Sequence, residues 1–572
     1  MLAFDGRDEC AAVTERWVDR WMWWAAWALV LAVALWFRLW QLGSQILIDD
    51  EWHALHQLML RDYREIFLSF GHADHSIPLT LFFKWLAETV GLSEWRLRFI
   101  PLLCGVLTVV AVPWVLRPWL QRHEAVLLGS LLALSPLLIH FTRYVRPYAI
   151  TILLGLLAVV ALWRWWHSSH DAGRWRWLLL FMPATILTAW LHPLTLLFTG
   201  GALLWFVLMG MIDLFRHQSM GALVRIMPVA MTSAAVTSVL LLPPLLSDPW
   251  SVSAKAGVDQ LQWATVLRAW ELMAGTANLW LALPMLGLTG VGLWVWWQRD
   301  RLFLAYWGFI TVLAVIALLL LNPAWVHHAL VPVRYASVAL PMVLMCVALG
   351  AFAVGRQLGR QLGAERSAMV LLAMALPVSV FVAGPLRDTY TGINQFTSHL
   401  RYHFDYNRDR NPFTRAVEQV AMPDIYQAMM AEAAEAPGEW VLVESAWHFE
   451  SHFSALSTFQ RQHQLPVAIG VISGLCTDWT WGEPFRRSDQ RWRLRQFVPL
   501  SDLPWRMDDR HRFVVLNRQP LVPPVADPRP LPSVDGCIEA LRDRLGTPWH
   551  EDAERVVFRL LAGTSAAPSG LD

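Results

Sequence analysis

Long apolar runs recur along most of the chain and stop near residue 387. About 20 apolar residues in a helix cross the hydrocarbon core of a bilayer, so each run predicts one membrane-spanning helix. About eleven such helices are expected. Their ranges are 21–40, 97–116, 125–142, 149–166, 177–191, 194–214, 226–246, 279–297, 302–321, 336–355 and 368–386. The pattern therefore predicts a polytopic α-helical membrane protein, with its transmembrane domain over 21–386.

Arginines cluster in alternate loops between these runs. The clusters are Arg16 and Arg20; Arg117 and Arg122; Arg164, Arg174 and Arg176; Arg216 and Arg225; Arg299 and Arg301; and Arg356, Arg360 and Arg366. The positive-inside rule places such loops in the cytoplasm, together with the N-terminal segment 1–20. A further apolar stretch, Ile77–Val90, would reverse that order if it crossed the membrane. We therefore expect it to form an interfacial or re-entrant helix, with Lys84 and Glu88 on its polar side.

After about residue 387 the composition becomes that of a water-soluble α/β domain, expected to fill 387–562 outside the membrane. Its predicted strands are Glu439–Ser445, Pro466–Ile472, Arg512–Asn517 and Arg555–Leu561, and Pro423–Ala436 is predicted to be helical. The tail 563–572 is expected to be disordered. Cys476 and Cys537 both fall in this domain, and the sequence is compatible with a disulfide between them or with two free thiols.

Composition restricts the function further. Hydrophobic residues make up 56% of the 572 residues and charged residues only 16%, which excludes a single water-soluble core. The formal net charge of +1 argues against a nucleic-acid-binding surface. The five cysteines show no CxxC spacing, so a structural zinc site is not expected. The sequence shows no glycine-rich nucleotide-binding loop, which favours a lipid-linked substrate over a nucleotide sugar.

An acidic cluster, Asp49-Asp50-Glu51, follows the first apolar run. Carboxylates beside hydrocarbon are costly, so their presence where the chain leaves the membrane suggests a function. They could act as a general base or bind a metal ion. The alternative is a solvated loop next to the membrane. We take the first external loop, 41–96, as the candidate catalytic loop.

Other loops on the same predicted side carry arginine, histidine and tyrosine. The candidate substrate-binding residues are Arg143, Tyr144, Arg146, Tyr148, His192, Arg334, Tyr335 and His75. Guanidinium groups match the oxygens of a phosphate or pyrophosphate. Each arginine taken alone could instead extend toward lipid headgroups. A lipid-phosphate substrate would bring its phosphate to this boundary while its tail stays in the bilayer.

The order of these motifs resembles the GT-C glycosyltransferases, and most closely their bacterial branch related to protein O-mannosyltransferases and lipid A aminoarabinose transferase. The motifs are Asp50-Glu51, His75–Leu79, Glu94–Pro101 with Gly105, Arg143–Tyr148, His192 and Arg334-Tyr335. The resemblance covers roughly residues 20–350. It implies an integral membrane enzyme that transfers a sugar, with inversion, from a polyprenyl-phosphate donor to an acceptor on the outer face.

The resemblance also implies roles for single residues. Asp50 would be the catalytic base and Glu51 would support it, while Asp49 leaves the assignment open by one position. The donor phosphate would be bound by Arg143, Arg146 and Arg334. Many relatives have consecutive prolines where this chain has Ile77-Pro78. Some relatives bind a divalent metal in this region, for which Asp74, His75 and His192 are the candidates here.

Three functions remain open from the sequence. The first is a hexosyl- or pentosyltransferase of the bacterial inner membrane, with its C-terminal domain in the periplasm and a glycan, lipid or protein as acceptor. The second is a flippase or transporter of a lipid-linked saccharide, in which the same arginines would hold the pyrophosphate. The third is a structural partner in envelope assembly.

Overall fold

The computed structural model describes residues 6–45, 47, 49–51, 54–55, 58, 61–71, 76–168, 171–253, 256–257, 259–387, 421–446, 459–466, 500–502, 510–518 and 533–562. The chain forms two compact units. The first unit comprises residues 1–40, 100–241 and 254–402, and the second comprises 41–99, 242–253 and 403–572. The boundary expected near residue 387 stays a prediction.

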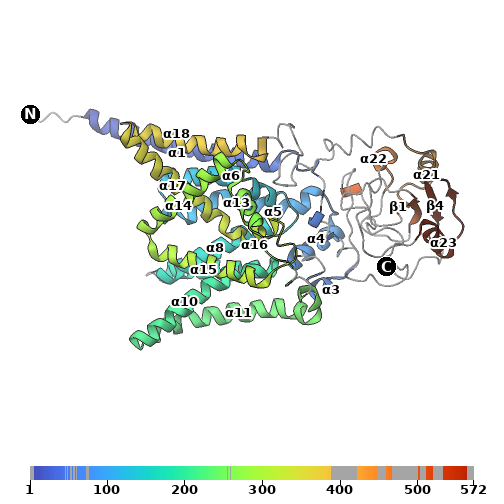
Figure 1. Cartoon of the computed structure of the whole chain (residues 1–572), viewed down its shortest axis with the longest axis horizontal. Helices are drawn as coiled ribbons and strands as arrows, with labels where there is room; N and C mark the ends of the chain where they lie inside the picture. Colours follow the sequence, from blue (N-terminus) through green and yellow to red (C-terminus); the bar gives the residue numbers. More distant parts are fainter. Residues whose placement is uncertain are drawn as a thin grey trace, which may run out of the picture. The chain divides into compact units, whose positions relative to one another are not determined.

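Long helices that lie side by side make up the first unit (Figure 1). They are α1 (Gly6–Leu39), α5 (Glu94–Val115), α6 (Arg122–Leu134), α7 (Pro136–Thr142), α8 (Tyr148–His167), α9 (Asp171–Leu191), α10 (Leu196–His217), α11 (Gly221–Ser247), α13 (Trp263–Ala274), α14 (Leu279–Arg299), α15 (Arg301–Leu321), α16 (Leu330–Ala336), α17 (Leu340–Gln361) and α18 (Glu365–Ala383). The first residues of α5, 94–99, and the last residues of α11, 242–247, belong to the second unit. The helices α14 and α17 pack along one another, as do α8 and α9. Gly292 allows the close packing of α14 on α17, because a Cβ at this position would lie 1.8 Å from the carbonyl oxygen of Cys346.

Nine helices among the described residues are long and apolar enough to cross a membrane, or ten if the bent pair α6–α7 is one span. This confirms the prediction of a polytopic α-helical membrane protein. About eleven spans were expected. Ten of the expected ranges correspond to the nine helices and the bent pair. The eleventh, 177–191, falls in α9, which is helical but is not among the nine. Arg174 and Arg176 occupy the first turns of α9 and shorten its apolar part.

The expected span 125–142 is divided into two helices that meet at an angle of 59°. Pro136 has no N–H to donate to the preceding turn, so the helix cannot continue through it unchanged. The Ser135 hydroxyl accepts a hydrogen bond from Leu138 N at 3.3 Å and caps the new helix. The guanidinium of Arg38, on α1, donates to the carbonyl oxygens of Leu132 and Ala133, each at 3.0 Å. Carbonyl groups exposed by the break are thereby satisfied, as a membrane interior requires.

The second unit contains η1 (Asp49–Glu51), α3 (Tyr63–Phe67) and α4 (Ile77–Thr89). Helix α4 has 13 residues, so it is about 20 Å long and shorter than the bilayer core. Its interfacial or re-entrant placement stays a prediction. Lys84, expected on a polar side, is instead buried, with its ammonium 3.5 Å from Glu88 and 5.5 Å from the ring centroid of Tyr63. The reason is that α3 packs on this face of α4.

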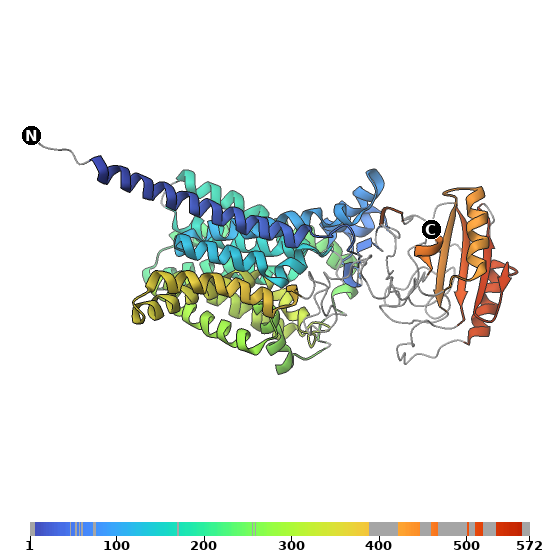
Figure 2. The ribbon, with the colours of Figure 1, turned by 90° about the horizontal axis from the view of Figure 1, so that it is seen from above.

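The C-terminal part of the second unit contains a four-stranded mixed sheet in the order β1-β2-β4-β3. Its strands are β1 (Trp440–Ala446), β2 (His511–Asn517), β3 (His550–Glu551) and β4 (Arg555–Leu560). The first two strands are parallel, and the other pairs are antiparallel. The helices α21 (Asp424–Glu435) and α23 (Val534–Leu545) lie alongside the sheet (Figure 2).

Three of the four predicted strands are confirmed as β1, β2 and β4, and the predicted helix is confirmed as α21. The fourth predicted strand, Pro466–Ile472, lies outside the described residues from 467 onward. The short strand β3 was not predicted, because a two-residue strand gives no alternating pattern. Cys537 is disulfide-bonded. Cys476, with which the sequence is compatible as a partner, lies outside the described residues, so the pairing stays open.

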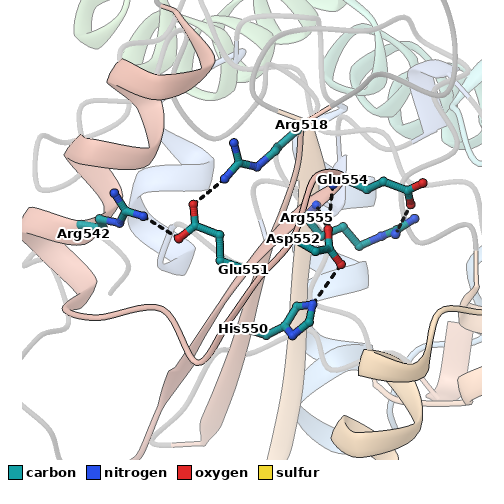
Figure 3. A network of polar contacts seen from close by, with 7 residues as sticks. All are labelled: Arg518, Arg542, His550, Glu551, Asp552, Glu554 and Arg555. Carbon is teal, nitrogen blue, oxygen red and sulfur yellow. Dashed lines mark hydrogen bonds and ion pairs between the residues drawn. The ribbon is translucent and has the colours of Figure 1, made fainter.

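Polar side chains hold the end of this sheet together (Figure 3). Arg518 and Arg542 both donate to the carboxylate of Glu551. The carboxylate of Asp552 accepts from His550 Nε2 at 2.9 Å and from the backbone N–H of Arg555 at 2.6 Å. These contacts connect the β3–β4 turn to α23 and to the residue that follows β2.

A second polar cluster lies in the interior of this sheet. Glu444 is buried, and its Oε1 accepts hydrogen bonds from the Tyr426 hydroxyl at 2.6 Å and from Asn517 Nδ2 at 3.0 Å. Burial raises the pKa of the Glu444 carboxyl. His463 stacks on the Tyr426 ring with a centroid distance of 5.4 Å, and burial lowers its pKa to about 3. His463 is therefore neutral in the folded protein at physiological pH.

Candidate functional site

The acidic cluster forms a single 3-10 turn, η1, in the second unit. Its three residues differ in their surroundings. Glu51 is fully buried, whereas Asp50 is half-buried. The backbone of Asp49 belongs to the same turn, while its side chain lies outside the described residues. Of the two described carboxylates, Asp50 is therefore the one that solvent reaches.

Arg98, in the first part of α5, holds this turn in place. Its Nη2 lies 3.3 Å from Glu51 Oε1, and both side chains have no exposed surface. Its Nη1 donates to the carbonyl oxygens of Leu42 at 3.2 Å and Gln45 at 2.7 Å. One guanidinium thus joins the segment that follows the first span to the acidic turn. A buried ion pair needs such additional hydrogen bonds to offset its desolvation.

Arg98 was visible in the sequence only as part of the motif Glu94–Pro101, without a role of its own. The available signal was a cation at the start of an apolar run, where it must find a partner or reach the interface. Its neighbour in the motif, Arg96, instead donates to the backbone carbonyl oxygen of Gly91 at 3.0 Å and is exposed. The distinction between these two arginines depends on tertiary packing.

Arg143, a candidate for the donor phosphate, lies at the end of α7 and is buried. Its Nη1 donates to the carbonyl oxygens of Phe37 at 3.1 Å, Arg38 at 3.3 Å and Trp40 at 2.8 Å. These carbonyls belong to the C-terminal end of α1 and the residue after it, where helix carbonyls lack partners within the helix. Arg143 therefore caps the first span.

Five other candidates form a continuous row in the first unit. The guanidinium carbon of Arg146 lies 5.9 Å from the ring centroid of Tyr148, and the rings of Tyr148 and His192 are 5.9 Å apart. His192 lies 5.5 Å from the ring of Tyr335. Arg334 Nη2 donates to the hydroxyl of Tyr335 at 3.2 Å. We call these five residues the arginine–aromatic row, because a guanidinium stands at each end of three rings.

Three separate segments supply the row. Tyr148 is the first residue of α8, immediately after the turn that carries Arg146. His192 follows α9 and has extended backbone angles, φ −156° and ψ 105°, as favoured for a residue before proline. Arg334 and Tyr335 lie in the short helix α16. The remaining candidate, Tyr144, is buried beside His140, with ring centroids 4.8 Å apart.

The row combines cationic and aromatic groups in a poorly solvated place. Arg146, Tyr148, His192 and Tyr335 are all buried, and Arg334 is half-buried. Guanidinium groups in such surroundings attract anions more strongly than in water. Planar donors match the oxygens of a phosphate group. The row can therefore bind a phosphate, and its tyrosine hydroxyls can add hydrogen bonds.

Asp74 and His75 lie outside the described residues. Within the described parts of the chain, no group of three or more histidine, cysteine, aspartate or glutamate side chains could hold a metal ion. His192 packs between the rings of Tyr148 and Tyr335.

No protein-family model and no curated protein matches the chain. Among solved structures, it is similar to ArnT from Cupriavidus metallidurans bound to undecaprenyl phosphate, with 15% identity, 94% of this chain and 98% of that chain covered, and a TM-score of 0.46. It is also similar to the oligosaccharyltransferase of Archaeoglobus fulgidus in the apo form, with 12% identity, 74% and 59% coverage, and a TM-score of 0.43.

Proposed function

We propose that this protein is a membrane glycosyltransferase that transfers a sugar from a polyprenyl-phosphate-linked donor to an acceptor outside the cytoplasm. The observation that carries the proposal is the arginine–aromatic row, in which Arg146 and Arg334 flank three buried rings. A polyprenyl phosphate is an anionic leaving group, and fixed cations stabilise the charge that develops on it.

Asp50 is the proposed general base. It belongs to the turn that the buried Glu51–Arg98 pair holds, and it is half-buried rather than sealed from solvent. Its carboxylate accepts the proton of the acceptor hydroxyl while the hydroxyl oxygen attacks the anomeric carbon. The bond from that carbon to the phosphate oxygen breaks in the same step, and the polyprenyl phosphate leaves. A single displacement of this kind inverts the anomeric centre.

The roles of the other candidates follow from their contacts. Arg146 and Arg334 bind the donor phosphate, while Tyr148, His192 and Tyr335 orient it. Arg143 supports the end of α1, and Glu51 supports the turn of Asp50 through Arg98. The sugar is a hexose or pentose, and the acceptor is a glycan, a lipid or a protein. The arginine-rich loops favour a cytoplasmic N-terminus in a bacterial inner membrane, with the C-terminal domain in the periplasm.

The direct test compares envelope glycans, lipids and proteins by mass spectrometry in cells that carry the wild-type chain or Asp50→Asn. We expect one glycosylated species to be present with the wild type and absent with Asp50→Asn, at equal protein levels in the membrane. Asn keeps the size of the side chain but cannot accept a proton at neutral pH. Unchanged glycosylation in the Asp50→Asn cells would reject the base assignment.

A flippase for a lipid-linked saccharide is the second candidate. The observation in its favour is the 59° break between α6 and α7, because proline-broken helices often line transport pathways. Liposomes that contain the purified chain, a labelled lipid-linked sugar and no acceptor distinguish the two functions. A flippase would move the label between leaflets under these conditions, whereas a glycosyltransferase would leave the label in place.

A further inference from the structure

A cavity of about 390 Å³ opens in the first unit near the C-terminal end of α8. It is lined by Trp114, Val115, Arg117, Pro118, Arg164 and Trp177. We call it the tryptophan–arginine cavity. Two cations and two indole rings contribute to its wall, and no carboxylate does. The cavity is thus electropositive, and a third of its lining residues are aromatic.

Arg164 is the central cation of this cavity. Its guanidinium carbon lies 5.1 Å from the ring centroid of Trp177 and 5.8 Å from that of Trp119. The side chain is half-buried, and its Nε donates to no acceptor among the described residues. The two rings fix the plane of the guanidinium through cation–π contacts. Because Nε is itself buried, only the Nη groups of Arg164 can face a molecule in the cavity.

Hydrogen bonds and a stacked pair of rings fix the wall beside Arg164. Trp119 Nε1 donates to Asp300 Oδ2 at 2.9 Å, and its ring stacks on Phe303 at a centroid distance of 3.9 Å. Arg299 donates to the carbonyl oxygen of Trp119 at 2.7 Å and pairs with both carboxylate oxygens of Glu124, each at 2.7 Å. The nearby acidic residue Glu124 is therefore neutralised by Arg299 rather than by the arginines of the cavity.

We infer that the tryptophan–arginine cavity binds the phosphate of an anionic lipid headgroup. A phosphate diester accepts hydrogen bonds from the planar guanidinium of Arg164, and Arg117, which is exposed, adds a second charge. Trp114 is 65% exposed at the end of the apolar helix α5, where an indole ring meets the headgroup region of a bilayer. Basic pockets between membrane helices on the cytoplasmic side are typical sites for such headgroups.

This cavity is distinct from the proposed donor site. Tyr148 is the first residue of α8 and Arg164 lies in its last turn, so the two are about 24 Å apart along the helix axis. That distance approaches the thickness of the hydrocarbon core. The arginine–aromatic row and the cavity therefore serve opposite membrane faces, and the cavity does not depend on the proposed function.

Native mass spectrometry of the full chain in detergent tests the inference. The probes are phosphatidylglycerol, zwitterionic phosphatidylcholine and inorganic phosphate. We expect phosphatidylglycerol to bind, and Arg117→Gln/Arg164→Gln to weaken that binding about tenfold or more, since hydrogen bonds to a charged group are lost. The matched control is Arg122→Gln/Arg176→Gln, which removes the same charge from two exposed arginines that do not line the cavity and should bind like the wild type.

Competition with inorganic phosphate distinguishes a lipid headgroup from a free phosphate as the occupant of the cavity. If millimolar phosphate does not displace the lipid, the glycerol and acyl parts contribute and a lipid is the occupant. Full displacement of phosphatidylglycerol by phosphate would make a free phosphate the occupant and overturn the inference. Phosphatidylcholine binding as tightly as phosphatidylglycerol would also overturn it. So would a loss of phosphatidylglycerol binding in the control variant equal to that in Arg117→Gln/Arg164→Gln. Should Arg164→Gln fail to fold, Arg117→Gln alone, at an exposed position, must still weaken phosphatidylglycerol binding severalfold.

Discussion

The carboxylate of Glu51 lies 3.3 Å from the guanidinium of Arg98, and neither side chain has any exposed surface. This ion pair distinguishes Glu51 from the neighbouring Asp50, two carboxylates that cannot be told apart from the sequence. Glu51 faces the interior and binds a cation, while Asp50 keeps contact with solvent. The same guanidinium also binds the backbone at Leu42 and Gln45, so the turn and the segment before it form one unit.

Removal of one member of this pair should destabilise the protein. Arg98→Met removes the arginine that pairs with the buried carboxylate of Glu51 and the donor of two backbone carbonyls, a loss of about 3–5 kcal/mol. Thermal unfolding of the purified full chain in detergent measures the change. The double variant Glu51→Gln/Arg98→Met removes both charges and should recover part of the loss. Equal destabilisation by the single and double variants would contradict the importance of the buried charge.

Substitution of Asp50 should affect catalysis more than folding. Asp50→Asn removes the proposed base from a half-buried position, so we expect a decrease in kcat of about 10²–10⁴-fold. The unfolding temperature should stay near that of the wild type. The control is Asp49→Asn, which carries the same chemical change one position earlier. A larger loss in Asp49→Asn would transfer the role of base to Asp49.

The three candidate arginines should separate into two groups. Arg143→Gln loses the cap on the end of α1, so it should lower the unfolding temperature. Arg146→Gln and Arg334→Gln should each raise KM for the donor about tenfold, because a hydrogen bond to a charged phosphate is lost. Steady-state kinetics with varied donor, together with unfolding temperatures, checks both expectations. An unchanged KM in Arg146→Gln and Arg334→Gln would exclude the arginine–aromatic row as the phosphate site.

His463 should make the C-terminal sheet sensitive to acid. Burial lowers its pKa to about 3, from 6.5. Below pH 6.5 the unfolded chain binds a proton that the folded protein does not, so His463 lowers stability as the pH falls from about 6.5 to 3. Glu444 acts in the opposite direction, because burial raises its pKa and the folded protein takes up its proton first. The loss of stability in acid that His463 causes should be absent from His463→Phe, whereas the effect of Glu444 should remain.

Hydrogen exchange over β1 in the full chain, corrected for the intrinsic pH dependence of exchange, measures this local stability. His463→Phe keeps the stacking on Tyr426 and loses one hydrogen bond from Leu465 N at every pH. The wild type should lose protection between pH 6.5 and 4, whereas His463→Phe should lose less. Parallel profiles for the two proteins would show that His463 is not the acid-sensitive group.

The sequence by itself determined the elements that depend on local pattern. Apolar runs of membrane length located the helices, and alternation located β1, β2 and β4, because burial in lipid or in a sheet imposes its period directly on the chain. The sequence also identified the residues of the arginine–aromatic row as candidates for one substrate site. Pro136 was visible in the span 125–142. The division of this span into two helices was not, because a proline can either kink a helix or end it.

Tertiary structure decided which of these residues bind one another. Arg38 lies in α1, yet its partners are carbonyls about 95 positions away that the break at Pro136 exposes. Arg143 and Arg146 differ by three positions, and only their contacts distinguish a helix cap from a member of the row. The pairing of Glu51 with Arg98 has the same origin. A charge in a poorly solvated interior must find a partner, and its identity depends on which segments the fold brings into contact.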